Sequence, residues 1–251
     1  MILAILQARV SSSRLPGKVM RPILGQPMLA RQIERILRAR YIDKLVVATS
    51  TEPDDDAIDQ LCKAVGVECF RGSLNDVVDR FYQAAMMYKP EHVVRLTGDC
   101  PLSDPAIIDR LIEFHLTGDY DYSSNAILPT YPDGLDAEIM RFSALEKAWQ
   151  EADDNASREH VTLYIYQHPQ IFKIGVEQNS VDLSHLRWTV DELADFELVE
   201  KIYQHYYLSN PKFETQDILS FLEECPELKT MNTTFNRNEG LNISLGMQTL
   251  E

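Results

Sequence analysis

Short apolar runs alternate with apolar residues at helical spacing along the first 116 residues of the chain. Residues 2–8 form an apolar run, a loop rich in Ser, Pro and Gly follows, and apolar residues then recur at helical spacing from Met28 to Leu37. The same order predicts strands at 44–49, 67–70 and 92–97 and helices at 54–65, 75–88 and 105–116. Such alternation predicts an α/β fold, with a Rossmann-like, doubly wound, mostly parallel sheet and right-handed crossovers.

The regular alternation ends after Thr117. The later pattern predicts strands at 137–140, 171–176 and 186–190, and helices at 143–151, 157–167, 194–207 and 215–224. We expect a single domain of residues 1–229, in which about 120–170 form an inserted β/α segment. Residues 230–251 are polar and rich in Asn, so we expect a loosely packed C-terminal tail.

The composition is that of an ordinary globular protein with a formal net charge of −15. Binding to a phosphate backbone normally needs a basic surface, so this charge argues against a nucleic-acid partner. No apolar run approaches the roughly 18 residues that a membrane span needs, so we expect no membrane partner. The four cysteines have no metal-finger spacing, which is typical of free thiols in a reducing cytoplasm.

The cations are concentrated near the first loop. Residues 1–40 carry a net charge of +7 and the remainder −22. Arg9, Arg14 and Lys18 lie in the loop itself, together with Ser12 and Ser13. Cations, short hydroxyls and backbone N–H groups between a strand and a helix suit a polyphosphate, although neither the Walker sequence nor G-x-G-x-x-G is present. The alternative is a surface loop with incidental cations.

Two carboxylates follow predicted strands at distant places in the chain. Asp99 comes after the strand 92–97 and Asp191 after the strand 186–190. Because ligands of doubly wound sheets bind at the carboxyl ends of the strands, the two side chains could meet there. Two carboxylates with phosphate oxygens and waters make an octahedral Mg²⁺ site, whereas Asp99 alone could be an ordinary turn or N-cap residue.

Several sequence segments match one enzyme family in order along the chain. Residues 9–18, Arg-Val-Ser-Ser-Ser-Arg-Leu-Pro-Gly-Lys, resemble the signature loop of the sugar cytidylyltransferases, the family of CMP-KDO synthetase and acylneuraminate cytidylyltransferase. The spore coat polysaccharide branch of that family is the most similar, through Phe70-Arg71-Gly72-Ser73, Gly98-Asp99-Cys100-Pro101-Leu102, Arg158-Glu159-His160-Val161-Thr162 and Arg187-Trp188-Thr189-Val190-Asp191.

The resemblance implies the nucleotide-diphospho-sugar transferase type of fold and a transfer of CMP from CTP to a sugar, with release of pyrophosphate. It assigns catalysis to Arg14, Lys18, Asp99 and Asp191, and Mg²⁺ binding to the two aspartates. Its further implications are a homodimer and nucleotide-binding roles for Ala8, Arg9, Ser12, Ser13, Arg14, Lys18, Ala48, Thr49, Ser50 and Thr97. Arg71 or Arg80 could add a further phosphate contact, although Arg80 could equally be an exposed helix residue that pairs with Asp76.

The inserted segment is expected to bind the sugar through its polar side chains. A sugar acid would need an arginine for its carboxylate, and Arg158 is the candidate. His160 could bind the sugar or could be a capping or core histidine. The full set of sugar-side candidates is Tyr131, Asp133, Asp136, Glu138, Arg158 and His160.

Thr97 leaves the choice of base open, because relatives of the KDO type carry Gln directly before Gly-Asp. A nucleotidyltransferase that uses another nucleoside triphosphate is therefore an alternative. A glycosyltransferase of the same fold is another, although so many loop cations favour a triphosphate over a diphosphate. A non-catalytic nucleotide-sugar-binding protein is a third, against which the complete set of candidate catalytic residues argues.

Overall fold

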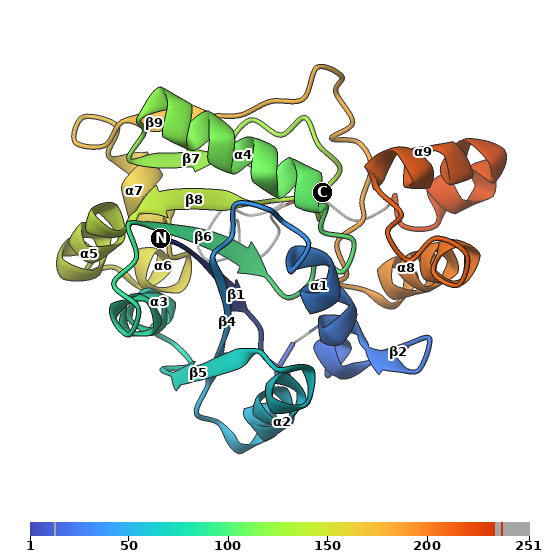
Figure 1. Cartoon of the computed structure of the whole chain (residues 1–251), viewed down its shortest axis with the longest axis horizontal. Coiled ribbons are helices and arrows are strands. Elements are labelled where there is room, and N and C mark those ends of the chain that lie inside the picture. The colour runs from blue at the N-terminus through green and yellow to red at the C-terminus, as the bar shows by residue number, and fades with distance from the viewer. Residues whose placement is uncertain (13, 234–236, 238–251) are drawn as a thin grey trace.

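A mixed sheet runs through the part of the chain that the computed structural model describes, which is residues 1–12, 14–233 and 237 (Figure 1). Seven strands of this part form the sheet in the order β5-β4-β1-β6-β8-β7-β9. Their bounds are Ile2–Gln7 (β1), Lys44–Ser50 (β4), Glu68–Gly72 (β5), His92–Thr97 (β6), Tyr122–Ser124 (β7), Glu138–Arg141 (β8) and Ile174–Val176 (β9). A separate hairpin pairs β2 (Pro22–Ile23) with β3 (Gln26–Pro27).

The strand directions confirm the predicted mostly parallel sheet. β1 pairs in parallel with β4 on one side and β6 on the other, and β5 extends the sheet in parallel beyond β4. β8 is antiparallel to both β6 and β7. The order of the strands reverses between β1 and β6, so this pair of strand ends is the topological switch point at which such sheets bind ligands.

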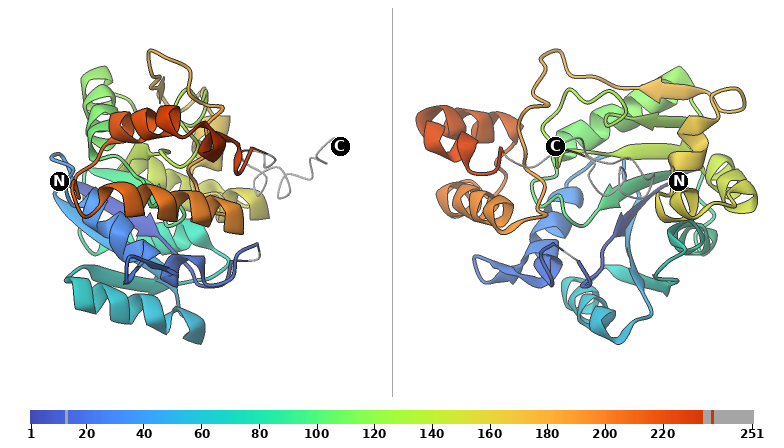
Figure 2. Two further views of the ribbon diagram at one scale, coloured as in Figure 1. Left: turned by 90° about the vertical axis from the view of Figure 1, so that its right-hand side faces the viewer. Right: turned by 180° about the vertical axis from the view of Figure 1, so that it is seen from behind.

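Helices cover both faces of the sheet because the buried side chains of β1 alternate between them. Ala4 and Leu6 belong to one buried cluster, which includes residues of α1, α2, α4, α8 and α9. Leu3 and Ile5 belong to the other, with α3, α5 and α7. Helices α8 and α9 lie side by side (Figure 2). A hydrogen bond from the Tyr206 hydroxyl to the Asp217 carbonyl joins them.

The α-helices agree with most of the predicted ranges. Their bounds are Met28–Ile36 (α1), Asp56–Val65 (α2), Val77–Met86 (α3), Pro105–Gly118 (α4), Phe142–Glu151 (α5), Asn155–Glu159 (α6), Leu163–Gln167 (α7), Leu193–Tyr206 (α8) and Thr215–Glu224 (α9). Short 3-10 helices occupy Lys18–Met20 (η1), Pro53–Asp55 (η2) and Pro226–Thr230 (η3). Within the described residues, no helix is long and apolar enough to cross a lipid bilayer.

Two predicted elements are wrong. The range 186–190 is no regular strand, because its backbone bonds go to two different segments: Trp188 and Thr189 donate to the Asp133 carbonyl, and Val190 donates to that of Asp99. The range 157–167 is two short helices, α6 and α7, because His160 leaves the helical region with φ −101° and ψ 62°.

Two features of the later chain were not predicted. Tyr122–Ser124 forms β7, which lies between β8 and the edge strand β9 in the sheet. The second feature is that the predicted C-terminal tail is packed against the domain at its start. Asn232 is 3% exposed and donates to the Arg187 carbonyl and the Asp195 carboxylate.

Candidate active site

The loop after β1 and the Gly-Asp turn after β6 meet because the two strands are neighbours. Gln7 and Thr97 are paired in register at the strand ends, and Gly98 N–H donates to the Gln7 carbonyl at 2.8 Å. A Cβ on Gly98 would come within 2.9 Å of the Ala8 Cβ, so glycine permits this close approach. The turn therefore presents Asp99 beside the cationic loop.

Lys18 joins that loop to both candidate carboxylates. Its ammonium donates to Asp191 Oδ1 at 2.8 Å and to the Val190 carbonyl at 2.7 Å, and lies 3.5 Å from Asp99 Oδ2. Burial by itself would lower the pKa of Lys18, but the two carboxylates outweigh it and raise that pKa. Burial likewise would raise the pKa of Asp99, and Lys18 holds it below its ordinary value.

Asp191 is surrounded by further cations. Arg14 reaches its Oδ1 at 2.9 Å, and Arg187 reaches its Oδ2 at 3.1 Å. The backbone carries Asp191 to this place, because Val190 N–H donates to the Asp99 carbonyl at 2.8 Å. Residues 92 positions apart in the chain thus present two carboxylates to one ammonium.

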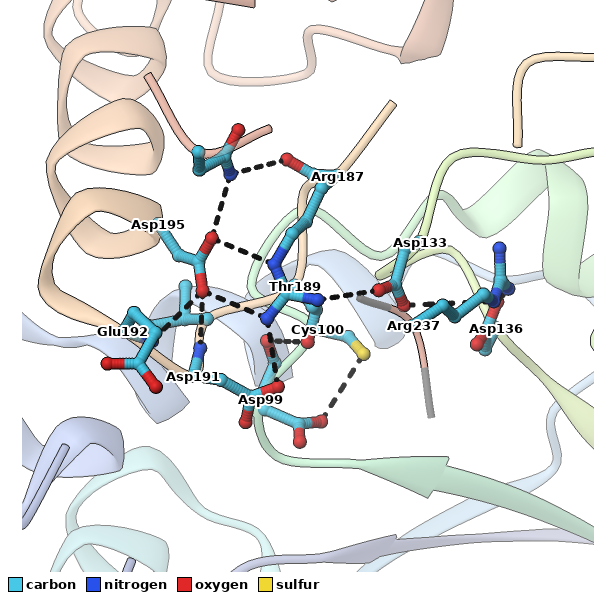
Figure 3. A network of polar contacts seen from close by, with 12 residues as sticks. Asp99, Cys100, Asp133, Asp136, Arg187, Thr189, Asp191, Glu192, Asp195 and Arg237 are labelled. Carbon is cyan, nitrogen blue, oxygen red and sulfur yellow. Dashed lines mark hydrogen bonds and ion pairs between the residues drawn. The ribbon is translucent and has the colours of Figure 1, made fainter. Parts of the chain in front are cut away.

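Arg187 holds a buried network of acids together (Figure 3). It binds both oxygens of Asp195, at 3.0 and 3.1 Å, and reaches Asp133 Oδ2 at 2.9 Å. Asp195 is fully buried in the first turn of α8, where it also accepts the backbone N–H of Asp191. The network therefore fixes the position of Asp191 from behind, so that its other oxygen faces Lys18.

A second network lies on β8. Glu138 pairs with Arg95 of β6, and it accepts hydrogen bonds from the hydroxyls of Tyr122 and Thr162. Burial would raise the pKa of Glu138, but Arg95 and the two hydroxyls outweigh it and lower that pKa. Glu138 is therefore ionised and held in place at neutral pH.

Asp136 is a buried carboxyl group beside two other acids. Burial raises its pKa to about 7, and the neighbouring Asp133 and Glu138 add to the rise, while Arg237 opposes it through an ion pair. Arg237 also lies 4.0 Å from Asp133 Oδ1. This carboxyl consequently changes its protonation near neutral pH.

Two cavities adjoin at this edge of the sheet. The loop cavity, of about 500 Å³, is bordered by the loop after β1 and by Arg80 of α3. The insertion cavity, of about 440 Å³, is bordered by β7, β8 and the segments that follow them. Six residues line both: Arg14, Arg95, Thr97, Asp99, His160 and Asp191. Two ligands bound in the two cavities would therefore meet at the carboxylates.

The donor set fits a divalent cation only with help from a ligand. Asp99 and Asp191 converge on the Lys18 ammonium, so their oxygens already face one positive charge. Among the described residues, no group of three or more His, Cys, Asp or Glu side chains could hold a metal ion. Two carboxylates with phosphate oxygens and waters would complete the octahedral set that Mg²⁺ requires.

Most of the residues predicted for the site line one of the cavities. From the nucleotide-binding set these are Ala8, Arg9, Ser12, Arg14, Lys18, Arg80 and Thr97, and from the sugar-binding set Asp133, Asp136, Glu138 and His160. Ser13 lies outside the described residues. Six others line neither cavity: Ala48, Thr49, Ser50, Arg71, Tyr131 and Arg158.

The positions of these six have local explanations. Arg158 pairs with Asp76 and donates to the Trp149 carbonyl, so its guanidinium joins α6 to α3 and its position argues against the predicted sugar contact. Arg71 pairs with Asp56 in the same way. Tyr131 is buried and donates to Glu177. The side chains of 48–50 are fully buried at the end of β4.

Sequence reasoning missed several lining residues, above all Arg95, Arg187, Tyr122 and Thr162. Arg95 carried a usable signal, since it is a lone charge within the apolar run of β6. Arg187 comes four residues before Asp191, but in the sequence it stands out only as part of a segment that resembles the family. The two hydroxyls carried no local signal, because their partner Glu138 is distant in sequence from Tyr122 and Thr162.

The comparisons with known proteins agree with this geometry. Residues 3–236 match the sequence profile described as Cytidylyltransferase. The chain is 34% identical to spore coat polysaccharide biosynthesis protein SpsF of Bacillus subtilis, over 91% of the chain and 97% of that protein. It is 40% identical to a 3-deoxy-manno-octulosonate cytidylyltransferase of Geobacter sulfurreducens, over 44% of each. The solved structure of a cytidylyltransferase from Leptospira borgpetersenii superposes with a TM-score of 0.88 at 32% identity, covering 94% of this chain and 99% of that one.

Proposed function

Because the chain belongs to the cytidylyltransferase family, we propose that it transfers CMP from CTP to a hydroxyl of a sugar acid and releases pyrophosphate. The product would be an activated sugar for surface polysaccharide or glycan synthesis. Two of the similar proteins support the choice of CTP and a sugar acid as substrates and of a polysaccharide as the end product. They are the 3-deoxy-manno-octulosonate cytidylyltransferase and the spore coat polysaccharide biosynthesis protein SpsF.

One observation carries the proposal: the loop cavity and the insertion cavity share Asp99, Asp191 and Arg14 along their common border. A triphosphate in the loop cavity would place its phosphates beside Lys18 and the loop arginines. An acceptor in the insertion cavity would then approach the α-phosphorus from the other side of the carboxylates. This arrangement suits a direct displacement, in which catalysis consists of positioning and electrostatic stabilisation.

The cations of the loop would stabilise the charge that develops on the departing pyrophosphate. Lys18 is 8% exposed, so its ammonium acts in a place where water screens it little. Arg9 and Arg80 border the same cavity, and the pKa of Arg80 is lowered to about 10 by burial and by the nearby Arg9. Two adjacent guanidinium groups raise the local positive potential, which favours a polyanion.

Mg²⁺ is part of the proposal, held by Asp99 and Asp191. When bound, it would neutralise phosphate charge and polarise the α-phosphoryl group. The protein's own contribution is to orient the two carboxylates, through Lys18 in front and Arg187 behind. On the acceptor side, Arg14 has a third of its side chain exposed, which makes its guanidinium accessible to a substrate carboxylate.

The experiment measures pyrophosphate release with each of CTP, UTP, GTP and ATP, in the presence of Mg²⁺ and a panel of sugar acids that includes 3-deoxy-manno-octulosonate and acylneuraminates. We expect release that requires both CTP and an acceptor and that stops when EDTA is added. Asp99→Asn should lower kcat by about 100-fold or more, because it removes one of two metal carboxylates. Release with UTP or GTP but not CTP would contradict the cytidylyl assignment.

The homodimer and the cytoplasmic location are also proposals, supported by the family resemblance and by cysteines that are free in the described part of the chain. Light scattering coupled to size-exclusion chromatography tests the first: a mass twice the 28.8 kDa of the chain is expected, and a monomer at all concentrations would contradict it.

A further inference from the structure

His160 occupies the place where the two cavities adjoin. It follows the last residue of α6 and precedes α7, and it is among the residues that line both cavities. Its backbone is fixed on both sides: the N–H donates to the Ala156 carbonyl at 2.8 Å, and the carbonyl accepts from Leu163 at 2.6 Å. The break between the two short helices therefore holds the imidazole at the border that a nucleotide and an acceptor would share.

The ring differs from the other well-packed histidines in its hydrogen bonding. His92 and His115 contact each other through ring nitrogens 3.1 Å apart, and His115 also contacts the Ser123 hydroxyl at 2.9 Å. His160 Nε2 is buried without a partner, and no residue of the described chain bonds to Nδ1. Buried polar groups without partners are rare in folded proteins, and a ligand group is one explanation for such an atom.

The charge state of the imidazole follows from its surroundings. Burial lowers the pKa of His160 below its ordinary value of 6.5, and Arg95 lowers it further, whereas Glu159 and Glu138 act in the opposite direction. The ring is therefore neutral at pH 7 and retains a nitrogen lone pair.

We propose that His160 is the general base of the transfer, a role that rests on the proposed function. The acceptor hydroxyl gives its proton to an unprotonated ring nitrogen of His160 as its oxygen forms a bond to the α-phosphorus. At the same time, the bond from the α-phosphorus to the bridging oxygen of the leaving pyrophosphate breaks. The imidazolium then returns the proton to solvent after the products leave.

The other candidate bases are less well placed. Asp136 and Glu138 border only the insertion cavity, and each is in an ion pair with an arginine. Asp99 and Asp191 border both cavities, but Lys18 binds their oxygens and these two residues would hold the proposed metal. Among the described residues that line both cavities, His160 alone is a neutral base.

The test compares His160→Gln and His160→Ala with the wild type, using CTP and whichever sugar acid of the panel turns over fastest. We expect kcat to fall by about 10² to 10⁴-fold while KM for CTP stays within about twofold, as for loss of a general base. Added imidazole should restore part of the activity of His160→Ala. His185→Gln is the matched control, because His185 is exposed and borders neither cavity, and it should behave as wild type.

A kcat of His160→Gln within threefold of wild type would overturn the inference. So would a loss of kcat that is matched by an equal loss of CTP affinity and thermal stability, since that result would give His160 a structural role. Both results leave the proposed function intact, because the wild type still turns over. If the wild type released no pyrophosphate with any acceptor, the proposed function would fail and this inference with it.

Discussion

Replacing Lys18 with methionine removes the cation that Asp99 and Asp191 share. The methionine fills a similar volume, so the change isolates the charge. Lys18 is 10% exposed in its side chain, and its ammonium lies 2.8 Å from Asp191 and 3.5 Å from Asp99. After the substitution, two carboxylates lie close together, with Arg14 and Arg187 still near the Asp191 oxygens.

The expected loss can be bounded from these distances. With an effective dielectric constant of about 20, the attractions of the ammonium to Asp191 and Asp99 amount to about 6 and 5 kcal/mol. The ammonium is hydrated in the unfolded chain, and the loss of that hydration on folding offsets several kcal/mol of this attraction. Removal of one partner from a buried ion pair costs about 3–5 kcal/mol. Because two arginines still neutralise Asp191, we expect Lys18→Met to lower the free energy of unfolding by about 3 kcal/mol at pH 8.

Urea denaturation at pH 8 without divalent cations measures this loss. Lys18 holds the pKa of Asp99 below 3.8, so the contribution of the pair is complete above pH 3.8 and is lost as the pH falls through the lowered pKa. The double variant with Asp99→Asn should recover part of the loss, because it removes one of the two opposed carboxylates. Lys63→Met is the control, since the Lys63–Asp59 pair is exposed and screened by water, so its loss should change the stability far less than the loss of Lys18. A loss below 1 kcal/mol for Lys18→Met would refute the reasoning.

Three further changes test other parts of the structure. Relative to Asp136→Asn, the wild type should lose up to about 4 kcal/mol of stability as the pH rises from 3.8 to about 7 and then level off, because the folded state holds the proton of the Asp136 carboxyl more tightly than the unfolded state. A difference in unfolding free energy that stays constant between pH 4 and 8 would contradict that pKa. Gly134→Ala should lower the free energy of unfolding by more than the roughly 1–3 kcal/mol of a positive φ, since its Cβ would lie 2.4 Å from Thr189 N. Denaturation should show a smaller loss for Gly66→Ala, where φ is +73° and no atom lies within 4 Å of the added Cβ, and equal losses would contradict the predicted clash. Arg158→Gln should lower the melting temperature through loss of the ion pair with Asp76, but leave KM for the acceptor within about twofold of wild type in steady-state assays. A tenfold rise in that KM would indicate that Arg158 contacts the sugar.

The alternation of strands and helices was predictable because the buried side chains of β1 belong to two apolar clusters, one on each face of the sheet. Leu3 and Ile5 pack on one face and Ala4 and Leu6 on the other, which gives a continuous apolar run in the sequence. The extended segment 186–190 alternates apolar and polar residues as a strand does, yet its backbone hydrogen bonds go to two loops. Local pattern describes how a segment is buried and cannot identify the segment that receives its backbone bonds.

The candidate site was predictable where its residues follow neighbouring strands. The loop after β1 and Asp99 after β6 meet at the switch point, as the topology of the sheet requires. Which arginine faces a cavity was not predictable, because it depends on carboxylates far away in the chain. Arg158 is bound by Asp76, 82 residues earlier, whereas Arg95 is positioned at the cavity border by Glu138.

The identity of the product tests the proposed reaction most directly. Phosphorus NMR of a mixture of the protein, CTP, Mg²⁺ and the accepted sugar acid should show the three triphosphate signals replaced by pyrophosphate and by one phosphodiester signal that couples to the sugar. Formation of CDP and orthophosphate, or of a diphosphate-linked product from a sugar acid that carries no phosphate, would contradict transfer of CMP.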